Sequence, residues 1–448
     1  MKVILFFGDA RLERDWDQAN LDALLVKRGV KLYQPLSGED VVRAGWNQPT
    51  TGDATLLGPR WARWLRRHIL RTLIYVSWER RGSVTLKTKL ARRRAIRLRL
   101  EIGLCRLVDR VLCDGERLAR FIEGLIPVAK SATKLMQDMT PGLVVVATDI
   151  YRGQEVELVK AAKAAGIQTL GVVASWDTLT SKGSYLVPPD HLAVWGDASA
   201  GHAIERHGYT IGRVHVVGAL RMDTWKVSKV PGLASGKLPV VMVVGTSVAY
   251  IHNEHEVVTR LAKLGQKHGF SVWYRPHPRR LTRLEGDLGT LTAKWNAQGV
   301  FFDRGACVEE PVGFLPTVLS HVRVVVTAFS TLVIEAALHG TPSLLIGFGP
   351  SSGGAEGEHV AEVGTLIQHA EFEHMAEVTR WPGVTVCKTM NELESQVMSH
   401  ASSPRHSLHH ANVLRWHAMD VVQADGQTTA RMVQLVNDLV KGREPWKR

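Results

Sequence analysis

The sequence predicts an α/β protein with two Rossmann-like, doubly wound domains whose sheets are parallel. Short Val, Leu and Ile runs alternate with polar loops and helical stretches, which is typical of βαβ units because strands covered on both faces read as continuous apolar runs. The chain has 448 residues, enough for two or three domains. Residues 227–239 contain two prolines and two glycines without periodicity, which indicates a linker.

The expected elements form two series, one on each side of this linker. We expect a first domain at 1–226, a second at 240–420, and a terminal helix in 421–448 that is able to pack back on the first domain. The first series has strands at Val3–Phe7, Leu143–Ala147, Thr169–Ala174, Leu192–Trp195 and Val214–Val217, with helices at Glu155–Ala165 and Ala198–His207. The second has strands at Val240–Val244, Ser271–Arg275, Val324–Thr327 and Ser343–Ile346, with helices at Glu254–Leu264, Thr331–His339 and Gln427–Lys441.

Composition excludes several classes of protein. The chain is 45% hydrophobic and 22% charged, the balance of a globular protein. No apolar run approaches the ~18 residues of a membrane-spanning helix. The opening run Val3–Phe7 reads as a buried strand and not as a signal peptide. Four dispersed cysteines fit neither a zinc cluster nor a disulfide scaffold, so we expect a protein of the reducing cytoplasm.

Positive charge is concentrated in one region. The formal net charge is +13, and Arg60–Arg99 alone holds fourteen Lys or Arg against one acid, Glu79. Helical spacing over 60–73 separates arginines from an apolar face, and a second helical stretch covers 86–104. A basic amphipathic helix with tryptophans suits anionic lipid headgroups, which predicts a peripheral protein at the inner face of the membrane. The predicted membrane-facing residues are Arg60, Trp61, Arg63, Trp64, Arg67 and Arg71.

Two other interpretations of this basic region stay open. A helix that packs its apolar face on its own domain would leave the same arginines in solvent. Nucleic-acid binding is the third interpretation, but no zinc-finger, RNP or KH-type signature accompanies the charge.

The loop after the strand Ser271–Arg275 is the most informative one. It reads Arg275-Pro-His-Pro-Arg-Arg280, which places an imidazole and several guanidiniums at the carboxyl edge of a parallel sheet. Imidazole and guanidinium N–H groups suit a diphosphate that gains charge as it leaves. We therefore expect Arg275, His277 and Arg279 to contact phosphate; a purely structural His-Pro turn is the alternative.

A second loop follows the strand Val324–Thr327. Ser330 and Thr331 open the next helix, where hydroxyls and backbone N–H groups suit a phosphate. Glu335 lies one turn further on, where a carboxylate can accept both hydroxyls of a ribose. The alternative is an ordinary Ser/Thr helix cap followed by a solvent-facing glutamate.

These two loops resemble a known family. Arg275-Pro-His-Pro278 followed by Thr-x-x-Ser-Thr-(x)3-Glu-Ala-(x)3-Gly-x-Pro342 resembles the carboxy-terminal domain of GT-B-fold nucleotide-dependent transferases. Similar members are CDP-glycerol glycerophosphotransferases and the bacterial sialyl- and Kdo-transferases with a His-Pro motif. The resemblance implies two Rossmann-like domains facing across a cleft, phosphate contacts from His277, Ser330 and Thr331, and a ribose contact from Glu335. Thr327 stands where retaining members carry an acid, which favours an inverting reaction.

The first half carries a fainter likeness. Ala174–Gly183, Val194–Gly196 and Val214–Asp223 resemble the amino-terminal half of the same superfamily, and the last of them is similar to the non-hydrolysing UDP-N-acetylglucosamine 2-epimerases. Inverting transfer needs a base for the acceptor hydroxyl. Asp177 is the first candidate, although it could instead cap the next helix, and Asp149 is the second. Acceptor-side contacts are expected from Asp9, Thr180, Ser181 and Lys182.

Glycine-containing loops complete the expected site. Gly245, Thr246 and Ser247 follow the strand Val240–Val244, where a glycine allows a donor phosphate to approach the backbone. The stretch 347–357 is glycine-rich and suits a closing loop, although both loops could be ordinary surface loops. No Asp-x-Asp motif appears at the end of an expected strand and the histidines are scattered, so we expect no metal and no cofactor beyond the nucleotide-activated donor.

The sequence therefore predicts a metal-independent glycosyltransferase that moves a sugar from a nucleotide donor to a lipid-linked or surface-polymer acceptor. A CDP-glycerol-type glycerophosphotransferase shares the same loops and is the second interpretation. A nucleotide-sugar epimerase, which needs no membrane face, is the third. A non-catalytic adaptor for membranes or polyanions is the fourth, and it leaves the two phosphate-binding loops without a role.

Overall fold

The computed structural model divides the chain into two compact units. Unit 1 is Met1–Thr224 with Asp420–Arg448, and unit 2 is Trp225–Met419. The expected linker 227–239 lies outside the described residues. The structure describes residues 1–7, 10–33, 58–91, 96–112, 114–148, 150, 153–223, 240–246, 251, 254–277, 288–303, 314–349, 366–403 and 408–445.

Unit 1 contains a parallel six-stranded sheet with the order β2-β1-β3-β4-β5-β6. The sequence predicted all of its strands but β2, within one or two residues. The strands are β1 (Lys2–Phe7), β2 (Lys31–Tyr33), β3 (Leu143–Thr148), β4 (Gln168–Val173), β5 (His191–Val194) and β6 (Val214–Val216). The helices beside the sheet are α1 (Ala10–Gln18), α2 (Leu21–Lys27), α8 (Lys130–Met139), α9 (Gly153–Ala164), α10 (Thr178–Ser181), α11 (Asp197–His207), α12 (Leu220–Asp223) and α21 (Thr428–Val440), with a 3₁₀ turn at Ile211–Arg213.

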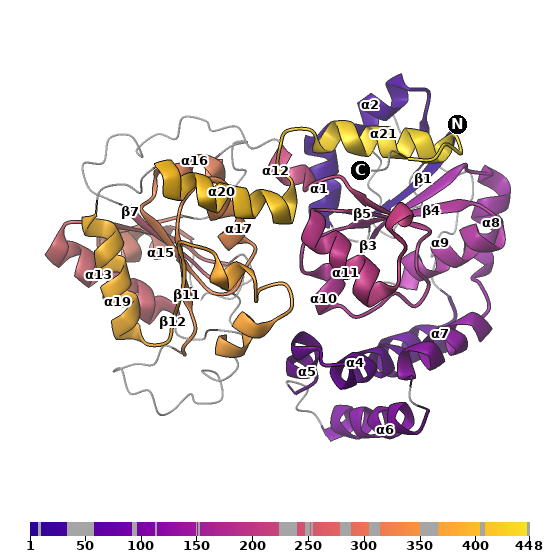
Figure 1. Ribbon diagram of the computed structural model, residues 1–448, viewed down its shortest axis with the longest axis horizontal. Helices are drawn as coiled ribbons and strands as arrows, with labels where there is room; N and C mark the ends of the chain where they lie inside the picture. Colours follow the sequence, from indigo (N-terminus) through magenta and orange to yellow (C-terminus); the bar gives the residue numbers. More distant parts are fainter. Residues whose placement is uncertain are drawn as a thin grey trace. The chain divides into compact units, whose positions relative to one another are not determined.

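Alternate side chains of β1 enter two different cores, which explains its continuous apolar sequence. Val3 and Leu5 pack in a core that includes Leu435 and Val436 of α21. Ile4 and Phe6 pack on the other face, against residues of α8 and α9. Helix α21 therefore helps α1 and α2 to cover one face of the unit 1 sheet although it comes from the far end of the sequence (Figure 1).

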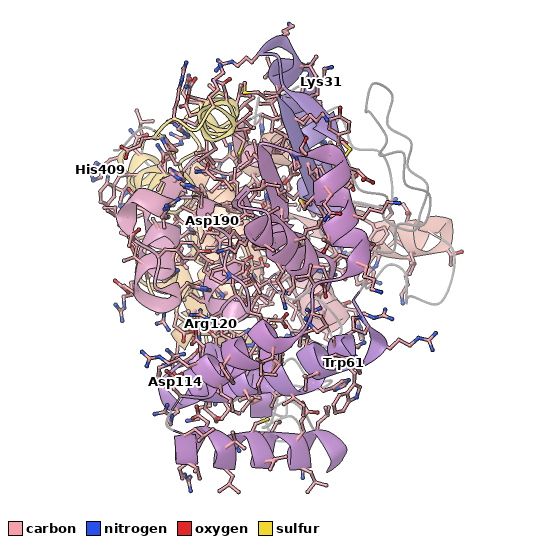
Figure 2. All side chains as sticks on the ribbon, turned by 90° about the vertical axis from the view of Figure 1, so that its right-hand side faces the viewer. Lys31, Trp61, Asp114, Arg120, Asp190 and His409 are labelled. Carbon is pink, nitrogen blue, oxygen red and sulfur yellow. The ribbon has the colours of Figure 1, made fainter. Side chains whose placement is uncertain are left out.

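A helical layer, defined as the described part of residues 60–125, is inserted between β2 and β3. It consists of α3 (Arg60–Leu65), a π-helical turn (Arg66–Leu70), α4 (Arg71–Arg80), α5 (Val84–Ala91), α6 (Ile96–Leu112) and α7 (Gly115–Leu125). Within unit 1, α4 and α7 lie between the sheet and α6, so α6 is the outermost helix of the layer (Figures 1 and 2).

The layer corrects the expectation of one regular helix over 60–73. The π-helical turn at Arg66–Leu70 takes up an extra residue, so the faces before and after it are out of phase with a 3.6-residue repeat. Arg66, which the regular spacing does not single out, is consequently buried at 5% exposure. The described residues of the expected helical stretch 86–104 lie in α5 and α6.

Buried charges fasten the layer to the rest of unit 1. Arg66 Nη1 donates to Glu157 Oε1 of α9 at 2.6 Å, and Arg66 Nη2 donates to Glu123 Oε1 of α7 at 2.7 Å. Lys160 Nζ donates to the same Glu123 oxygen at 2.9 Å. Desolvation opposes the charge of Arg66, but the bonds to the two carboxylates outweigh it and raise the Arg66 pKa above its ordinary value.

Unit 2 contains a second parallel six-stranded sheet, with the order β12-β11-β10-β7-β8-β9. The four central strands were predicted with their observed bounds; β9 and β12 were not. The strands are β7 (Val240–Val244), β8 (Ser271–Arg275), β9 (Val300–Phe302), β10 (Val324–Thr327), β11 (Ser343–Ile346) and β12 (Val384–Cys387). The helices are α13 (Glu254–His268), α15 (Leu288–Asn296), α16 (Phe314–His321), α17 (Leu332–Leu338), α19 (Met390–Ser402) and α20 (Leu408–Val422), with 3₁₀ turns at Gln368–Glu371 and Val378–Arg380.

Candidate functional site

The register of unit 2 brings three of the sequence-predicted loops to one edge of its sheet. Thr327 of β10 pairs with Val244 of β7, and Val244 pairs with Arg275 of β8. Neighbouring strands lie about 4.8 Å apart, so the ends of β8 and β10 are separated by about 10 Å. We call the described residues that leave these ends, 245–246, 275–277 and 327–331, together with Glu335, the strand-end site.

A buried glutamate that the sequence did not single out ties two of the loops together. Glu254, the first residue of α13, is 1% exposed. Its Oε2 accepts the N–H of Thr246 at 2.6 Å, and its Oε1 accepts the hydroxyl of Tyr274 at 2.7 Å. The N–H of Gly245 donates to the carbonyl of Arg275 at 2.8 Å. The N–H groups of Gly245 and Thr246 are therefore both used inside the protein.

Gly245 fits where no other residue does. A Cβ at this position would collide with Glu254 Oε1 and lie 2.9 Å from the backbone nitrogen of His277. The glycine thus holds the loop after β7 close to the half-buried His277. Ser247 and Arg279, the other predicted members of these two loops, lie outside the described residues.

Arg275 has a structural partner. Its Nη1 lies 2.9 Å from Oδ2 of Asp303, which follows β9 and is 5% exposed. The same oxygen accepts the indole N–H of Trp273 at 3.0 Å, and the N–H of Asp303 donates to the carbonyl of Tyr274 at 2.8 Å. Because Asp303 balances the guanidinium charge, Arg275 fixes the turn that presents His277.

The loop after β10 presents two half-buried hydroxyls. Ser330 Oγ lies 3.4 Å from Thr327 Oγ1. Thr331 occupies the N-cap position of α17, but its side chain makes no capping bond to the helix backbone. The hydrogen bond that an ordinary helix cap at Thr331 would make is therefore not formed. Glu335, one turn further on, is 8% exposed, so most of its side chain is covered.

Aromatic rings support this loop from a segment that the sequence did not predict. The ring of Phe329 lies 5.7 Å from that of His369, centroid to centroid. His369 stacks on Phe372 at 4.4 Å. The sequence signal for His369 and Phe372, like that for Asp303, is weak, because these residues lie far along the chain from the loops that they support.

In unit 1, the loop after β4 holds Asp177 firmly. Its Oδ1 accepts the hydroxyl of Ser175 at 2.6 Å, and its Oδ2 accepts that of Ser181 at 2.8 Å. Asp177 precedes α10 but makes no side-chain cap to it. Thr180 is fully buried and its hydroxyl donates to the carbonyl of Asp177. Ser181 and Thr180 thus support the aspartate.

The other predicted residues of unit 1 are less informative. Lys182 is half-buried, and the second candidate base, Asp149, lies outside the described residues, as does Asp9. Among the described residues, no group of three or more His, Cys, Asp or Glu side chains is arranged to hold a metal ion.

The predicted membrane-facing residues differ in solvent exposure: four are exposed and two are half-buried. Trp61 and Trp64 are 54% and 47% exposed. Arg60 and Arg67 are also exposed, whereas Arg63 and Arg71 are half-buried. Arg71 Nη2 donates to the hydroxyl of Tyr75 at 2.9 Å, one turn along α4. In the part of the chain that the structure describes, no helix has the length and apolar character needed to cross a bilayer.

No family model and no curated protein matches this sequence. Solved structures do resemble it. S. aureus MnaA solved with UDP has a TM-score of 0.54 at 11% identity, covering 98% of this chain and 97% of that one. The UDP-GlcNAc 2-epimerase of Neisseria meningitidis bound to UDP-GlcNAc has a TM-score of 0.53 at 11% identity, covering 97% and 99%. The glycotransferase of kitacinnamycin has a TM-score of 0.50 at 12% identity, covering 98% of both chains.

Similarity at such low identity, over nearly the full length of both chains, establishes the fold. Two parallel six-stranded sheets with flanking helices match structures of the GT-B type. The fold class that the sequence predicted is therefore confirmed: this chain has the GT-B fold.

Proposed function

We propose that this protein is a nucleotide-sugar-dependent glycosyltransferase that uses a lipid-linked or surface-polymer acceptor, inverts the anomeric centre and needs no metal. The observation that carries the proposal is the register of three adjacent strands. Val244 pairs with both Arg275 and Thr327, so the loops of the strand-end site leave these strands side by side. Carboxyl-end loops of parallel sheets are where ligands of such folds bind.

The donor phosphates meet side chains rather than loop amides in this proposal. The N–H groups of Gly245 and Thr246 are already bonded within the protein. His277 and the hydroxyls of Ser330 and Thr331 are the described groups suited to a diphosphate. As the bond between the sugar and the phosphate oxygen breaks, its electron pair stays on the nucleotide, and His277 stabilises that charge.

Asp177 serves as the general base. It takes the proton of the acceptor hydroxyl, whose oxygen then forms the new bond to the anomeric carbon. Two hydroxyl donors, Ser175 and Ser181, hold the carboxylate in one orientation, which suits a base that must meet an incoming hydroxyl. We expect Asp177→Asn to lower turnover by about 10²- to 10⁴-fold in a transfer assay while nucleotide affinity stays unchanged.

Nucleotide binding is the first test. A thermal-shift series with UDP, CMP, CDP, GDP and ADP selects the donor class, because a ligand that binds the folded state raises the melting temperature. We expect His277→Ala to weaken binding of the selected nucleotide about tenfold or more in calorimetric titration. His268→Ala, at the exposed end of α13 in the same unit, is the matched control and retains wild-type affinity. Absence of any nucleotide affinity contradicts the proposal and leaves the adaptor interpretation.

An epimerase is the second candidate, favoured by the likeness to the solved UDP-GlcNAc 2-epimerase of Neisseria meningitidis. The fate of the hydrogen at the sugar C2 and the need for an acceptor distinguish the two reactions. An epimerase acting on UDP-N-acetylglucosamine in D2O exchanges the hydrogen at the sugar C2 without any acceptor, whereas a transferase releases the nucleotide only when an acceptor is present. Deuterium at C2, detected by NMR, would replace the transferase proposal with the epimerase.

A further inference from the structure

Helix α6 exposes an apolar stripe on the side opposite its packed face. Leu100, Leu104, Leu107 and Val111 are 71%, 59%, 58% and 70% exposed. Their spacing of four, three and four residues places them on one side of the helix. The packed side is formed by buried residues, among them Ile102 and Cys105 at 5% and 2% exposure.

Side-chain bonds to α4 fix this orientation. They occur at three points along α6, so the helix is not free to turn its stripe inward. The bonds join Thr72 to Glu101 at 2.6 Å, Glu79 to Arg106 at 2.8 Å, and Arg80 to Asp109 at 2.6 Å. The stripe therefore faces away from α4. It lies on the helix that is outermost in the layer (Figure 1).

The helical layer around the stripe is positively charged at its surface. Residues 60–125 contain eighteen Lys or Arg and six Asp or Glu. None of the six acids is exposed, and each is bonded to a partner within unit 1. The exposed cations among the described residues are Arg60, Arg67, Arg80, Arg81, Lys87, Arg99, Arg106, Arg110 and Arg117.

We propose that the α6 stripe and its surrounding arginines dock this protein on an anionic phospholipid membrane. The leucines enter the boundary between headgroups and acyl chains while the arginines meet the phosphates, with the helix lying in the plane of the surface. This surface differs from the one that regular spacing over 60–73 predicts, because Leu65, Ile69 and Leu73 of that segment pack into the layer's own core.

The charge and the apolar stripe together favour an anionic membrane over a second copy of the chain or a nucleic acid. A second copy of the chain seated on the stripe would bring two cationic surfaces together without exposed acids from either layer to balance them. Nucleic acid would meet the arginines but would leave four large apolar side chains without a partner. An anionic bilayer satisfies the charge and the stripe together.

The test uses the full chain and vesicles of phosphatidylcholine with or without phosphatidylglycerol, in a flotation assay without nucleotide. We expect binding to the anionic vesicles that weakens with added salt, and little binding to neutral ones. The double variant Leu104→Gln/Leu107→Gln should lose about tenfold or more of this binding. Ile211→Gln/Leu408→Gln, which removes two exposed apolar side chains outside the layer (82% and 73% exposed), is the matched control and should bind as the wild type does.

Two results would overturn the docking proposal. One is wild-type binding by the stripe variant. The other is a wild-type chain that does not bind anionic vesicles. A dimer in light scattering that the stripe variant converts to a monomer would then identify a second copy of the chain as the occupant. Nucleotide titration of the same variants keeps the two proposals separate: loss of vesicle binding with unchanged nucleotide affinity concerns α6 alone, and the reverse concerns the strand-end site alone.

Discussion

Two neighbours crowd the α-carbon of Gly245, the carboxylate of Glu254 and the backbone nitrogen of His277. Glu254 is fixed in turn by Thr246 and Tyr274, so it has little room to retreat. The conformation of the loop after β7 and the position of His277 therefore depend on the absence of a side chain at residue 245.

We expect Gly245→Ala to lower the free energy of unfolding by about 1–3 kcal/mol in urea titration, because overpacking forces Glu254 or the His277 backbone to move. The affinity for the selected nucleotide should fall with it. Gly201→Ala, in α11 where a Cβ meets nothing within 4 Å, is the control and should be neutral or stabilising. An alanine at 245 that changes neither quantity would contradict the crowding.

His207 is a buried titratable group outside the strand-end site. Its Nε2 lies 2.7 Å from the carbonyl oxygen of Leu179, and its ring packs against Trp78 and Tyr185. Burial lowers the pKa of His207 to about 4; the Leu179 carbonyl and Glu116 act in the opposite direction but do not offset it.

We expect His207 to make stability depend on pH between about 6.5 and 4. The unfolded chain takes up a proton on His207 below pH 6.5, and the folded chain does so only near pH 4. The free energy of unfolding therefore decreases as the pH is lowered through this window, by about 2 kcal/mol at pH 5 relative to pH 7. Urea titrations at both pH values should show a smaller loss in His207→Gln. His268→Gln, at an exposed position, should keep the wild-type loss.

The π-helical turn between α3 and α4 turns one arginine inward and leaves its neighbour in solvent. Arg66 is 5% exposed and bonded to Glu123 and Glu157, both of which are fully buried. Arg67, the next residue, is exposed. The two positions therefore offer a matched comparison of buried and surface charge in one element.

We expect Arg66→Ala to destabilise unit 1 by about 3–5 kcal/mol, because Glu157 loses its buried cation and Glu123 keeps only Lys160. Arg67→Ala should change the free energy of unfolding by less than about 0.5 kcal/mol. Chemical denaturation followed by circular dichroism measures both. Equal effects from the two variants would mean that the inward turn at residue 66 is wrong.

The strands that the sequence predicted and those that it missed differ in position. β1, β3, β7 and β10 are buried on both faces and read as unbroken apolar runs. The missed strands β2, β9 and β12 are edge strands of three or four residues with an exposed or half-buried position in each, so their sequences lack that run. The π-helical turn was missed because a 3.6-residue repeat has no place for its extra residue.

The strand-end site was predictable only in part, for a physical reason. His277, Ser330 and Thr331 stand in strand-to-helix loops, where position along the sequence already indicates the carboxyl edge of the sheet. Glu254 and Asp303 act on those loops from other elements. Their contacts depend on the strand order β10-β7-β8-β9, which spacing along the chain does not reveal.

The path of the whole chain makes unit 1 discontinuous. Its core includes Leu435 of α21, which is fully buried against the sheet formed by the first 216 residues. We expect Leu435→Ala to destabilise unit 1 by about 2–5 kcal/mol, because it leaves a cavity beneath β1 and β3. Hydrogen exchange of the β1 and β3 amides should accelerate while that of β7 and β10 does not. Leu408→Ala, 73% exposed on α20, is the control.

The placement of α21 sets an order of events on the ribosome. Translation delivers β1 and β3 long before residues 428–440. The part of their sheet that α21 covers therefore stays open while unit 2, whose strands are continuous in the chain, is synthesised. A nascent polypeptide halted before residue 428 lacks the helix that finishes its earliest-made domain. We expect such a truncated chain to expose the apolar positions that α21 would bury and to be a ready substrate for chaperones and proteases.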